Sequence, residues 1–114
     1  MIAVVPVTGT SSKIYRFRLI SRVQELPEAG GIYCFCYPLR YPGAPIEGVY
    51  LGHAQNDLKV EVLQNETRRV AIEIGANKIG FIKVNSRLAR RRIYADLVEV
   101  FPDDLLPGGT TLGS

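Results

Sequence analysis

Arginine residues gather in three short stretches of the sequence, and each guanidinium group can hold a phosphate through two parallel hydrogen bonds. Residues 1–24 contain basic residues and no acid, and a second run of arginines falls within residues 87–92. Such clusters are the electrostatic footprint of a protein that binds a polyanion. They predict contact with DNA or RNA through the following residues: Arg16, Arg18, Arg68, Arg69, Arg87, Arg90, Arg91 and Arg92.

The charge itself leaves a second interpretation open. The formal net charge is only +3, which does not by itself require a polyanionic partner. On a helix, Arg92 would lie one turn before Asp96 and close to Glu99. Part of the last cluster would then be neutralised within its own helix and form an ordinary solvated face.

Cysteine and histidine are scarce, which limits metal and redox chemistry. The chain has two cysteines and one histidine, too few for a structural zinc site with its four ligands. Cys34 and Cys36 would lie on one face of a strand, where a mutual disulfide is strained, so we expect two reduced thiols. His53 is either a proton carrier or a surface residue. The sequence predicts no resident metal and no cofactor.

Strands are expected in the first half of the chain. In residues 13–20 the apolar alternation places Tyr15, Phe17 and Leu19 on the buried face of an edge strand. Residues 32–37 and 48–52 predict a β-hairpin, because the stretch between them is rich in proline and glycine and forms a loop.

Helices and one further strand are expected in the second half. Asn56 and Asp57 offer a cap for a short helix ending near Asn65. Its core-facing residues would be Leu58, Val62 and Leu63. Residues 66–74 fit either a strand or a helix, and residues 78–84 fit a strand.

A last helix completes the expected order of elements. Asn85 and Ser86 would cap it, and Pro102 would end it. Its apolar positions follow one helical face and are Ile93, Leu97, Val100 and Phe101.

The expected fold class is α+β, with a small, mostly antiparallel central sheet of about three to four strands flanked by two to three helices. The length of 114 residues fits a single domain, expected over residues 1–106, with a flexible tail over residues 107–114. No run of eighteen apolar residues is present, and no basic residue precedes the short apolar opening. The sequence therefore predicts a cytoplasmic protein without a membrane partner.

Two triplets in the expected hairpin carry a family resemblance. Gly31-Ile32-Tyr33 and Tyr50-Leu51-Gly52 resemble the two signature strands of the GIY-YIG nuclease superfamily. The resemblance extends over roughly residues 22–102 and includes a helix-then-strand segment and a closing helix. It makes Gly31, Ile32, Leu51 and Gly52 structural motif residues and implies a GIY-YIG-like fold.

The resemblance also implies site residues. Members of the superfamily hydrolyse phosphodiesters in a metal-assisted site. By position, Tyr33 would act in proton transfer near the attacking water and Tyr50 would help to orient that water. An arginine on the first helix would stabilise charge on the phosphate, and a glutamate on the closing helix would hold the metal.

Both of these last positions depart from the family pattern. The arginine position is Val60 here, and the glutamate position is Tyr94. Lys59 could replace the arginine only with a one-residue shift, and its ammonium lacks the planar fork of a guanidinium. The sequence therefore favours a catalytically degenerate member, so an enzymatic activity is not the leading expectation.

Three functions stay open from the sequence. The first is a degenerate GIY-YIG-like domain that binds nucleic acid through its arginines. The second is an active endonuclease that requires magnesium or manganese, with Tyr33, Tyr50, His53 and Lys59 as catalytic residues and Asp96 or Glu99 as a relocated carboxylate. The third is a protein-interaction or homodimerising domain that pairs through an exposed edge strand, residues 13–20.

Overall fold

A computed structural model describes residues 3–101 of the chain. In chain order the strands and α-helices are β1 (Ala3–Thr8), β2 (Ile14–Ile20), β3 (Gly31–Cys36), β4 (Gly48–Ala54), α1 (Leu58–Gln64), α2 (Thr67–Glu73), β5 (Lys78–Lys83) and α3 (Arg87–Leu97). Single 3₁₀ turns follow β2 at Val23–Glu25 and α3 at Val98–Val100. This content confirms the expected α+β class.

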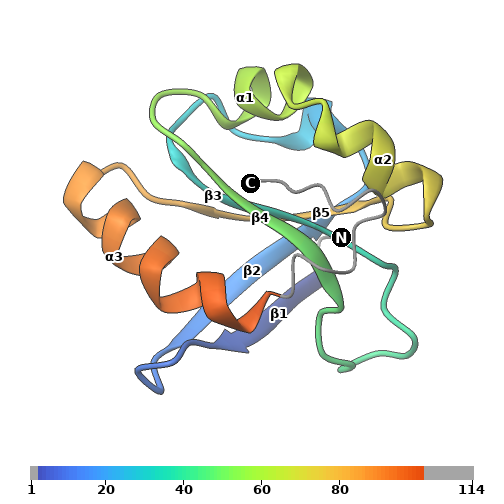
Figure 1. Ribbon diagram of the computed structural model, residues 1–114, viewed down its shortest axis with the longest axis horizontal. Coiled ribbons are helices and arrows are strands. Elements are labelled where there is room, and N and C mark those ends of the chain that lie inside the picture. The colour runs from blue at the N-terminus through green and yellow to red at the C-terminus, as the bar shows by residue number, and fades with distance from the viewer. Residues whose placement is uncertain (1–2, 102–114) are drawn as a thin grey trace.

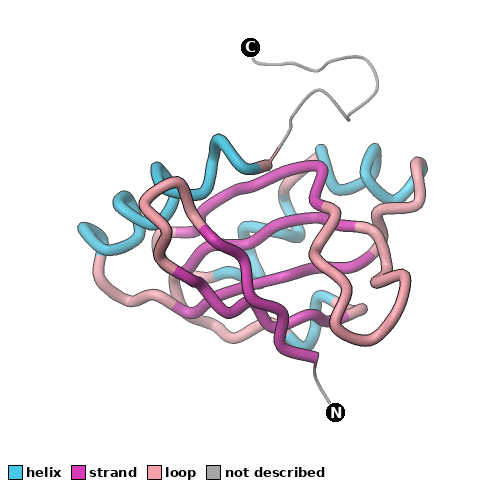
Figure 2. Tube along the Cα trace, turned by 90° about the horizontal axis from the view of Figure 1, so that it is seen from below, coloured by secondary structure: helices cyan, strands magenta, loops and turns pink. Residues whose placement is uncertain are grey.

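The strands form one sheet in the order β1-β2-β5-β3-β4, and all neighbouring strands are antiparallel (Figure 2). The expected β-hairpin is confirmed as β3 and β4, joined by a loop over residues 37–47. The sheet has five strands, one more than the upper end of the expected range. Strand β3 lies between β4 and β5, so the first signature triplet occupies an internal strand.

The expected edge strand is wrong. Residues 13–20 correspond to β2, which lies inside the sheet because β1 pairs with it from Ala3 opposite Leu19 to Thr8 opposite Ile14. On that side the outer strand of the described sheet is β1. Pairing with a partner through residues 13–20 is therefore blocked by the chain's own first strand. Alternation did place Phe17 correctly in the core, while Tyr15 and Leu19 are half-buried.

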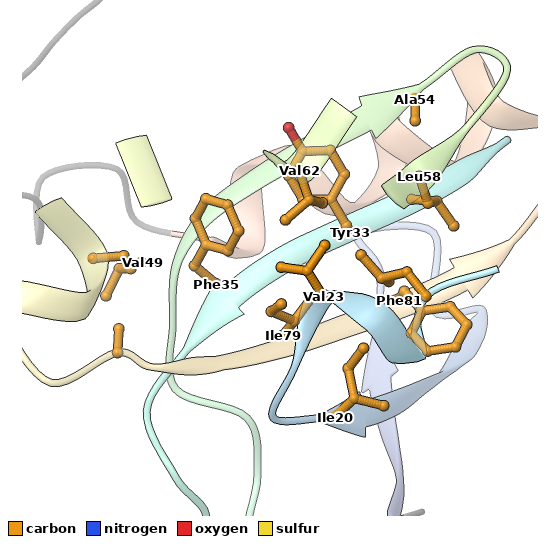
Figure 3. Packing of buried hydrophobic residues seen from close by; sticks show 13 residues of the cluster. Ile20, Val23, Tyr33, Phe35, Val49, Ala54, Leu58, Val62, Ile79 and Phe81 are labelled. Carbon is orange, nitrogen blue, oxygen red and sulfur yellow. The ribbon is translucent and has the colours of Figure 1, made fainter. Parts of the chain in front are cut away.

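Helices cover both faces of the sheet. In Figure 1, α1 and α2 lie together at the top and α3 lies apart from them. The residues Tyr33, Phe35 and Val49 pack with α1 and α2 in one hydrophobic cluster, part of which is drawn in Figure 3. Ile32, Cys34 and their neighbours pack with α3 in a second cluster. Because both faces are covered, every residue of β3 is buried.

Helix α1 begins as the sequence indicates. The Asp57 carboxylate accepts hydrogen bonds from the backbone N–H groups of Lys59 and Val60, at 2.9 and 3.2 Å, and so caps the helix. Leu58 and Val62 are fully buried, as expected. The expectation for Leu63 is wrong, because it lies about 100° around the helix from Val62 and is 63% exposed.

The ambiguous segment is a helix. Residues 67–73 form α2, and Ala71 is fully buried in the hydrophobic cluster that contains Tyr33 and Phe35. The helix stops before Gly75, whose φ of +97° is a conformation that glycine adopts without strain. A strand at these residues would have counted against the family resemblance, but the segment is helical.

Helix α3 begins at the expected cap, where the Ser86 hydroxyl accepts a hydrogen bond from the Ala89 N–H at 3.2 Å. Leu97 and Phe101 are buried, whereas Val100 is 39% exposed. The expected stop at Pro102 and the expected tail over residues 107–114 lie outside the described residues. Within residues 3–101, no helix has the length and apolar character needed to cross a membrane.

Candidate functional site

A hollow of about 470 Å³ lies beside β4, between α1 and α3. It brings together both signature tyrosines and both positions at which the family pattern fails. The residues that line it are Tyr33, Tyr50, Gly52, His53, Gln55, Asn56, Asp57, Val60, Glu61 and Tyr94. We call it the tyrosine hollow.

The hairpin register positions the two tyrosines. Tyr33 pairs with Gly52 across the strands, and Phe35 pairs with Tyr50. The Tyr50 ring stacks on Phe35 at 5.4 Å between centroids and lies 6.1 Å from the Tyr33 ring. A Cβ atom at Gly52 would lie 2.6 Å from the Tyr33 hydroxyl oxygen, so glycine is needed here to make room for the ring. Tyr33 is fully buried and forms the floor of the hollow.

Asn65, between α1 and α2, ties the tyrosines to the helices. Its Oδ1 accepts a hydrogen bond from the Thr67 N–H at 2.9 Å, which leaves Nδ2 directed toward the sheet. Nδ2 donates to the Tyr33 hydroxyl at 2.6 Å and to the Tyr50 hydroxyl at 3.3 Å. Sequence reasoning assigned Asn65 no role beyond the end of a helix. Its only sequence signal is a position two residues before Thr67, which favours a side-chain turn.

Burial controls the protonation of Tyr33. Removal from water raises the pKa of its hydroxyl well above the usual range, and the neighbouring Tyr50 raises it further. The hydrogen bond from Asn65 acts in the opposite direction but is the smaller effect. Tyr33 is therefore a neutral phenol near pH 7, able to donate a hydrogen bond and poorly suited to accept a proton.

His53 and Tyr94 form the α3 side of the hollow. His53 is exposed at the end of β4, and its ring meets that of Tyr94 edge-to-face at 5.0 Å between centroids. His53 is among the residues that line the hollow. Tyr94 thus places an aromatic ring where the family pattern has a metal-binding carboxylate.

The α1 side of the hollow is apolar and acidic. Val60 lines it at the position of the family arginine, and Glu61 follows with an exposed carboxylate. Lys59, the shifted candidate, is not among the residues lining the hollow, and its Nζ lies 3.7 Å from the Glu28 carboxylate. The structure brings Tyr33, Tyr50 and His53 together without Lys59.

A second hollow of about 300 Å³ adjoins the first and shares three lining residues with it: His53, Gln55 and Tyr94. Its other lining residues are Arg87, Arg90 and Arg91 from α3, so we call it the arginine hollow. Arg90 is 7% exposed, and its Nη1 donates at 3.0 Å to the backbone carbonyls of Val84 and Asn85. Arg90 therefore fastens the start of α3, while Arg87 and Arg91 are exposed to solvent.

The remaining candidate arginines lie elsewhere. Arg16 and Arg18 line a hollow with Lys83 and Glu25, and Arg68 and Arg69 line another beside Asn65. Arg68 and Arg69 are not among the residues lining the tyrosine hollow, so neither fills the place of the family arginine at Val60. The candidates thus fall on separate surfaces instead of forming one patch.

Asp96 serves the β1-β2 hairpin and not the site. Its carboxylate accepts hydrogen bonds from the Thr10, Ser11 and Tyr15 hydroxyls at 2.8, 2.6 and 2.7 Å. Among residues 3–101 Asp96 forms no ion pair with Arg92, so the interpretation that pairs the two is wrong. Asp96 is not among the residues that line the tyrosine hollow. The two residues diverge because the carboxylate turns toward the hairpin.

Metal-ligating side chains do not converge in the part of the chain that the structure describes: no group of three or more His, Cys, Asp or Glu residues could hold an ion. Among the described residues that line the tyrosine hollow, the carboxylates are Asp57, which caps α1, and Glu61. Cys34 and Cys36 are buried free thiols. A hydrogen bond with Cys36, together with burial, holds the pKa of the Cys34 thiol well above its usual range.

The two adjoining hollows offer a ligand different groups. The tyrosine hollow provides aromatic, amide and hydroxyl groups, and the arginine hollow provides guanidinium groups. Comparisons with family models, with curated proteins and with solved structures find no match to this chain.

Proposed function

We propose that this protein is a catalytically degenerate GIY-YIG-like domain that binds nucleic acid, with Arg87 and Arg91 holding the phosphate backbone. The observation that carries the proposal is the adjacency of the two hollows. The exposed guanidinium groups of α3 border the same residues, His53 and Tyr94, that line the tyrosine hollow. A nucleic-acid strand held by these arginines would pass beside the tyrosine hollow.

Support for the resemblance comes from residues distant in the sequence. Tyr33, Tyr50, Val60 and Tyr94 line one hollow, although they belong to four different elements. Convergence of these four positions is what the family pattern requires of its tyrosines, arginine and glutamate. Three of these elements are the ones that carry the resemblance in the sequence: β3 and β4 hold the two triplets, and α3 is the closing helix.

Loss of catalysis is argued from the chemistry of the same residues. Val60 cannot stabilise charge on a phosphate, and Tyr94 has no carboxylate oxygen to offer a hard cation. Burial raises the pKa of the Tyr33 hydroxyl still further above neutral, so Tyr33 does not form a phenolate base near pH 7. A bound phosphodiester would thus meet positive charge at the arginine hollow but no cation at position 60 and no carboxylate at position 94.

Binding to labelled DNA and RNA, as a short duplex and as single strands, tests the proposal. Affinity should fall steeply as salt rises from about 50 to about 200 mM. The variant Arg87→Ala/Arg91→Ala should bind more weakly and reduce the salt slope for duplex by about 2, since it removes two phosphate contacts. Fluorescence anisotropy measures both quantities.

Arg68→Ala/Arg69→Ala is the matched control, because it removes the same charge from a hollow that shares no lining residue with the site. It should retain most of the affinity and the wild-type slope. Equal losses in the two variants would reduce the proposal to attraction by net charge. No binding at low salt, or binding unaffected by salt, would overturn it.

A further inference from the structure

The two adjoining hollows differ in charge. Arg87 and Arg91 border one, whereas the described residues that line the other include Asp57 and Glu61 and, apart from His53, no basic residue. The Asp57 carboxylate is engaged in capping α1. The Glu61 carboxylate is exposed and has no hydrogen-bond or ion-pair partner among residues 3–101. A phosphate would be attracted to the arginine hollow and repelled from the tyrosine hollow.

The tyrosine hollow instead suits a flat, neutral group. Tyr50, His53 and Tyr94 present aromatic surface, and Gln55 and Asn56 add exposed amides. Bases of unpaired strands stack on aromatic side chains of this kind. Its volume of about 470 Å³ lies within the usual range for a small-molecule site.

We propose that the tyrosine hollow binds an unpaired nucleobase, guanine in preference to the others, while Arg87 and Arg91 hold the adjoining phosphate. This inference rests on the proposed function and names the substrate class. The Glu61 carboxylate presents two acceptor oxygens. Guanine matches them because its Watson–Crick edge carries two neighbouring N–H donors, whereas the other bases place acceptors beside their donors.

The proposal makes the protein a single-strand binder. In a duplex the Watson–Crick edge is paired and the ring is stacked, so neither reaches the hollow. A single strand exposes both, and its backbone can place a phosphate against α3 while one base enters beside Tyr50. Duplex binding would then use the arginines alone.

The variant Glu61→Gln distinguishes a bound base from a bound phosphate in the tyrosine hollow, because it changes the binding affinity in opposite directions in the two cases. If a phosphate lay there, removing the negative charge would tighten binding to every strand. If Glu61 accepts from guanine, the variant should weaken binding to a single strand carrying one guanine by about tenfold or more. Its affinity for the same strand with uracil in place of that guanine should stay nearly unchanged.

The experiment measures the affinities of a uridine-rich RNA strand, the same strand with one guanosine, and the duplex of the latter, by fluorescence anisotropy. Wild type should prefer the guanosine strand, and His53→Ala should weaken single-strand binding by about fivefold or more and weaken duplex binding by less. Glu73→Gln is the matched control: it removes the same charge from an exposed residue at the end of α2. It should leave the guanine preference intact.

The outcomes distinguish the two proposals. Equal affinity for all three ligands, with binding that still depends on Arg87 and Arg91, overturns the base-binding site and leaves the proposed function standing. Tighter binding by Glu61→Gln to every strand assigns the hollow to a phosphate and also overturns it. Absence of binding to all ligands overturns both. Circular dichroism and thermal unfolding of each variant exclude misfolding as the cause of a loss.

Discussion

Asn65 Nδ2 lies 2.6 Å from the Tyr33 hydroxyl oxygen and joins the linker between α1 and α2 to strand β3 of the hairpin. Oδ1 of the same side chain accepts a hydrogen bond from the N–H of Thr67, the first residue of α2, so one amide joins that helix to both tyrosines of the hollow. Because the amide donates to both tyrosine hydroxyls, each phenol accepts from Asn65 and keeps its own proton for another partner.

Replacement of Asn65 by alanine should therefore destabilise the protein by about 2 kcal/mol. The change removes the hydrogen bond from the Thr67 N–H, worth about 1 kcal/mol, and leaves the buried Tyr33 hydroxyl without its donor. Urea unfolding followed by circular dichroism gives the free energy of unfolding. Asn77→Ala, at an exposed asparagine without a side-chain hydrogen bond among the described residues, is the control and should cost far less. Equal costs would contradict the role assigned to Asn65.

Gly52→Ala tests the close approach of β4 to the Tyr33 ring. The added Cβ would lie 2.5 Å from Cζ of that ring, and the buried ring has little space to move. Overpacking of this kind costs about 1–3 kcal/mol. In a Tyr33→Leu background the same change should cost less, since the ring is gone, and a double-mutant cycle of unfolding free energies measures the difference. Additive costs would show that the ring is not the obstacle.

Local signals predicted most of the fold. The β3-β4 hairpin, the caps at Asp57 and Ser86 and strand β5 could be anticipated because turn-forming residues, cap side chains and apolar periodicity act over a few residues. Strand β1 was missed, because a short apolar opening that includes Pro6 does not predict a pairing with residues 14–19. Only that pairing makes β2 an internal strand.

The site was predicted less completely than the fold. The two signature triplets led to Tyr33 and Tyr50 and, by position, to Val60 and Tyr94, all of which line the tyrosine hollow. Asn65 and Glu61 were missed because their roles depend on which way a helix faces after it packs on the sheet. The charge pattern grouped Arg90 with its neighbours, although Arg90 is buried against backbone carbonyls, a contact that no charge count reveals.

Acid should loosen the contact between α3 and the β1-β2 hairpin. Hydrogen bonds from Ser11, and then from Tyr15, hold the pKa of the Asp96 carboxyl well below its usual range. A carboxyl with a lowered pKa in the folded state contributes stability above its unfolded pKa of about 4, and this contribution is lost as the pH falls toward the folded pKa. We therefore expect the free energy of unfolding to decrease below about pH 4.

Asp96→Asn should remove much of this acid dependence, and Ser11→Ala should reduce it, because Ser11 makes the largest contribution to the shift. Urea unfolding at a series of pH values measures both slopes. Wild-type slopes in the two variants would show that another carboxyl controls the acid response.

The proposed loss of catalysis predicts that the wild-type protein leaves supercoiled plasmid intact in magnesium and in manganese. Val60 and Tyr94 replace the cation and carboxylate that the family pattern supplies, and each such group typically contributes a few kcal/mol to transition-state stabilisation. Tyr33→Phe removes the hydroxyl implied in proton transfer and provides the control for contaminating nucleases. Metal-dependent nicking that is lost in Tyr33→Phe would establish an active endonuclease. Nicking at the same rate in both proteins would come from a contaminant, and the absence of nicking at a protein concentration that saturates the DNA would leave binding as the function.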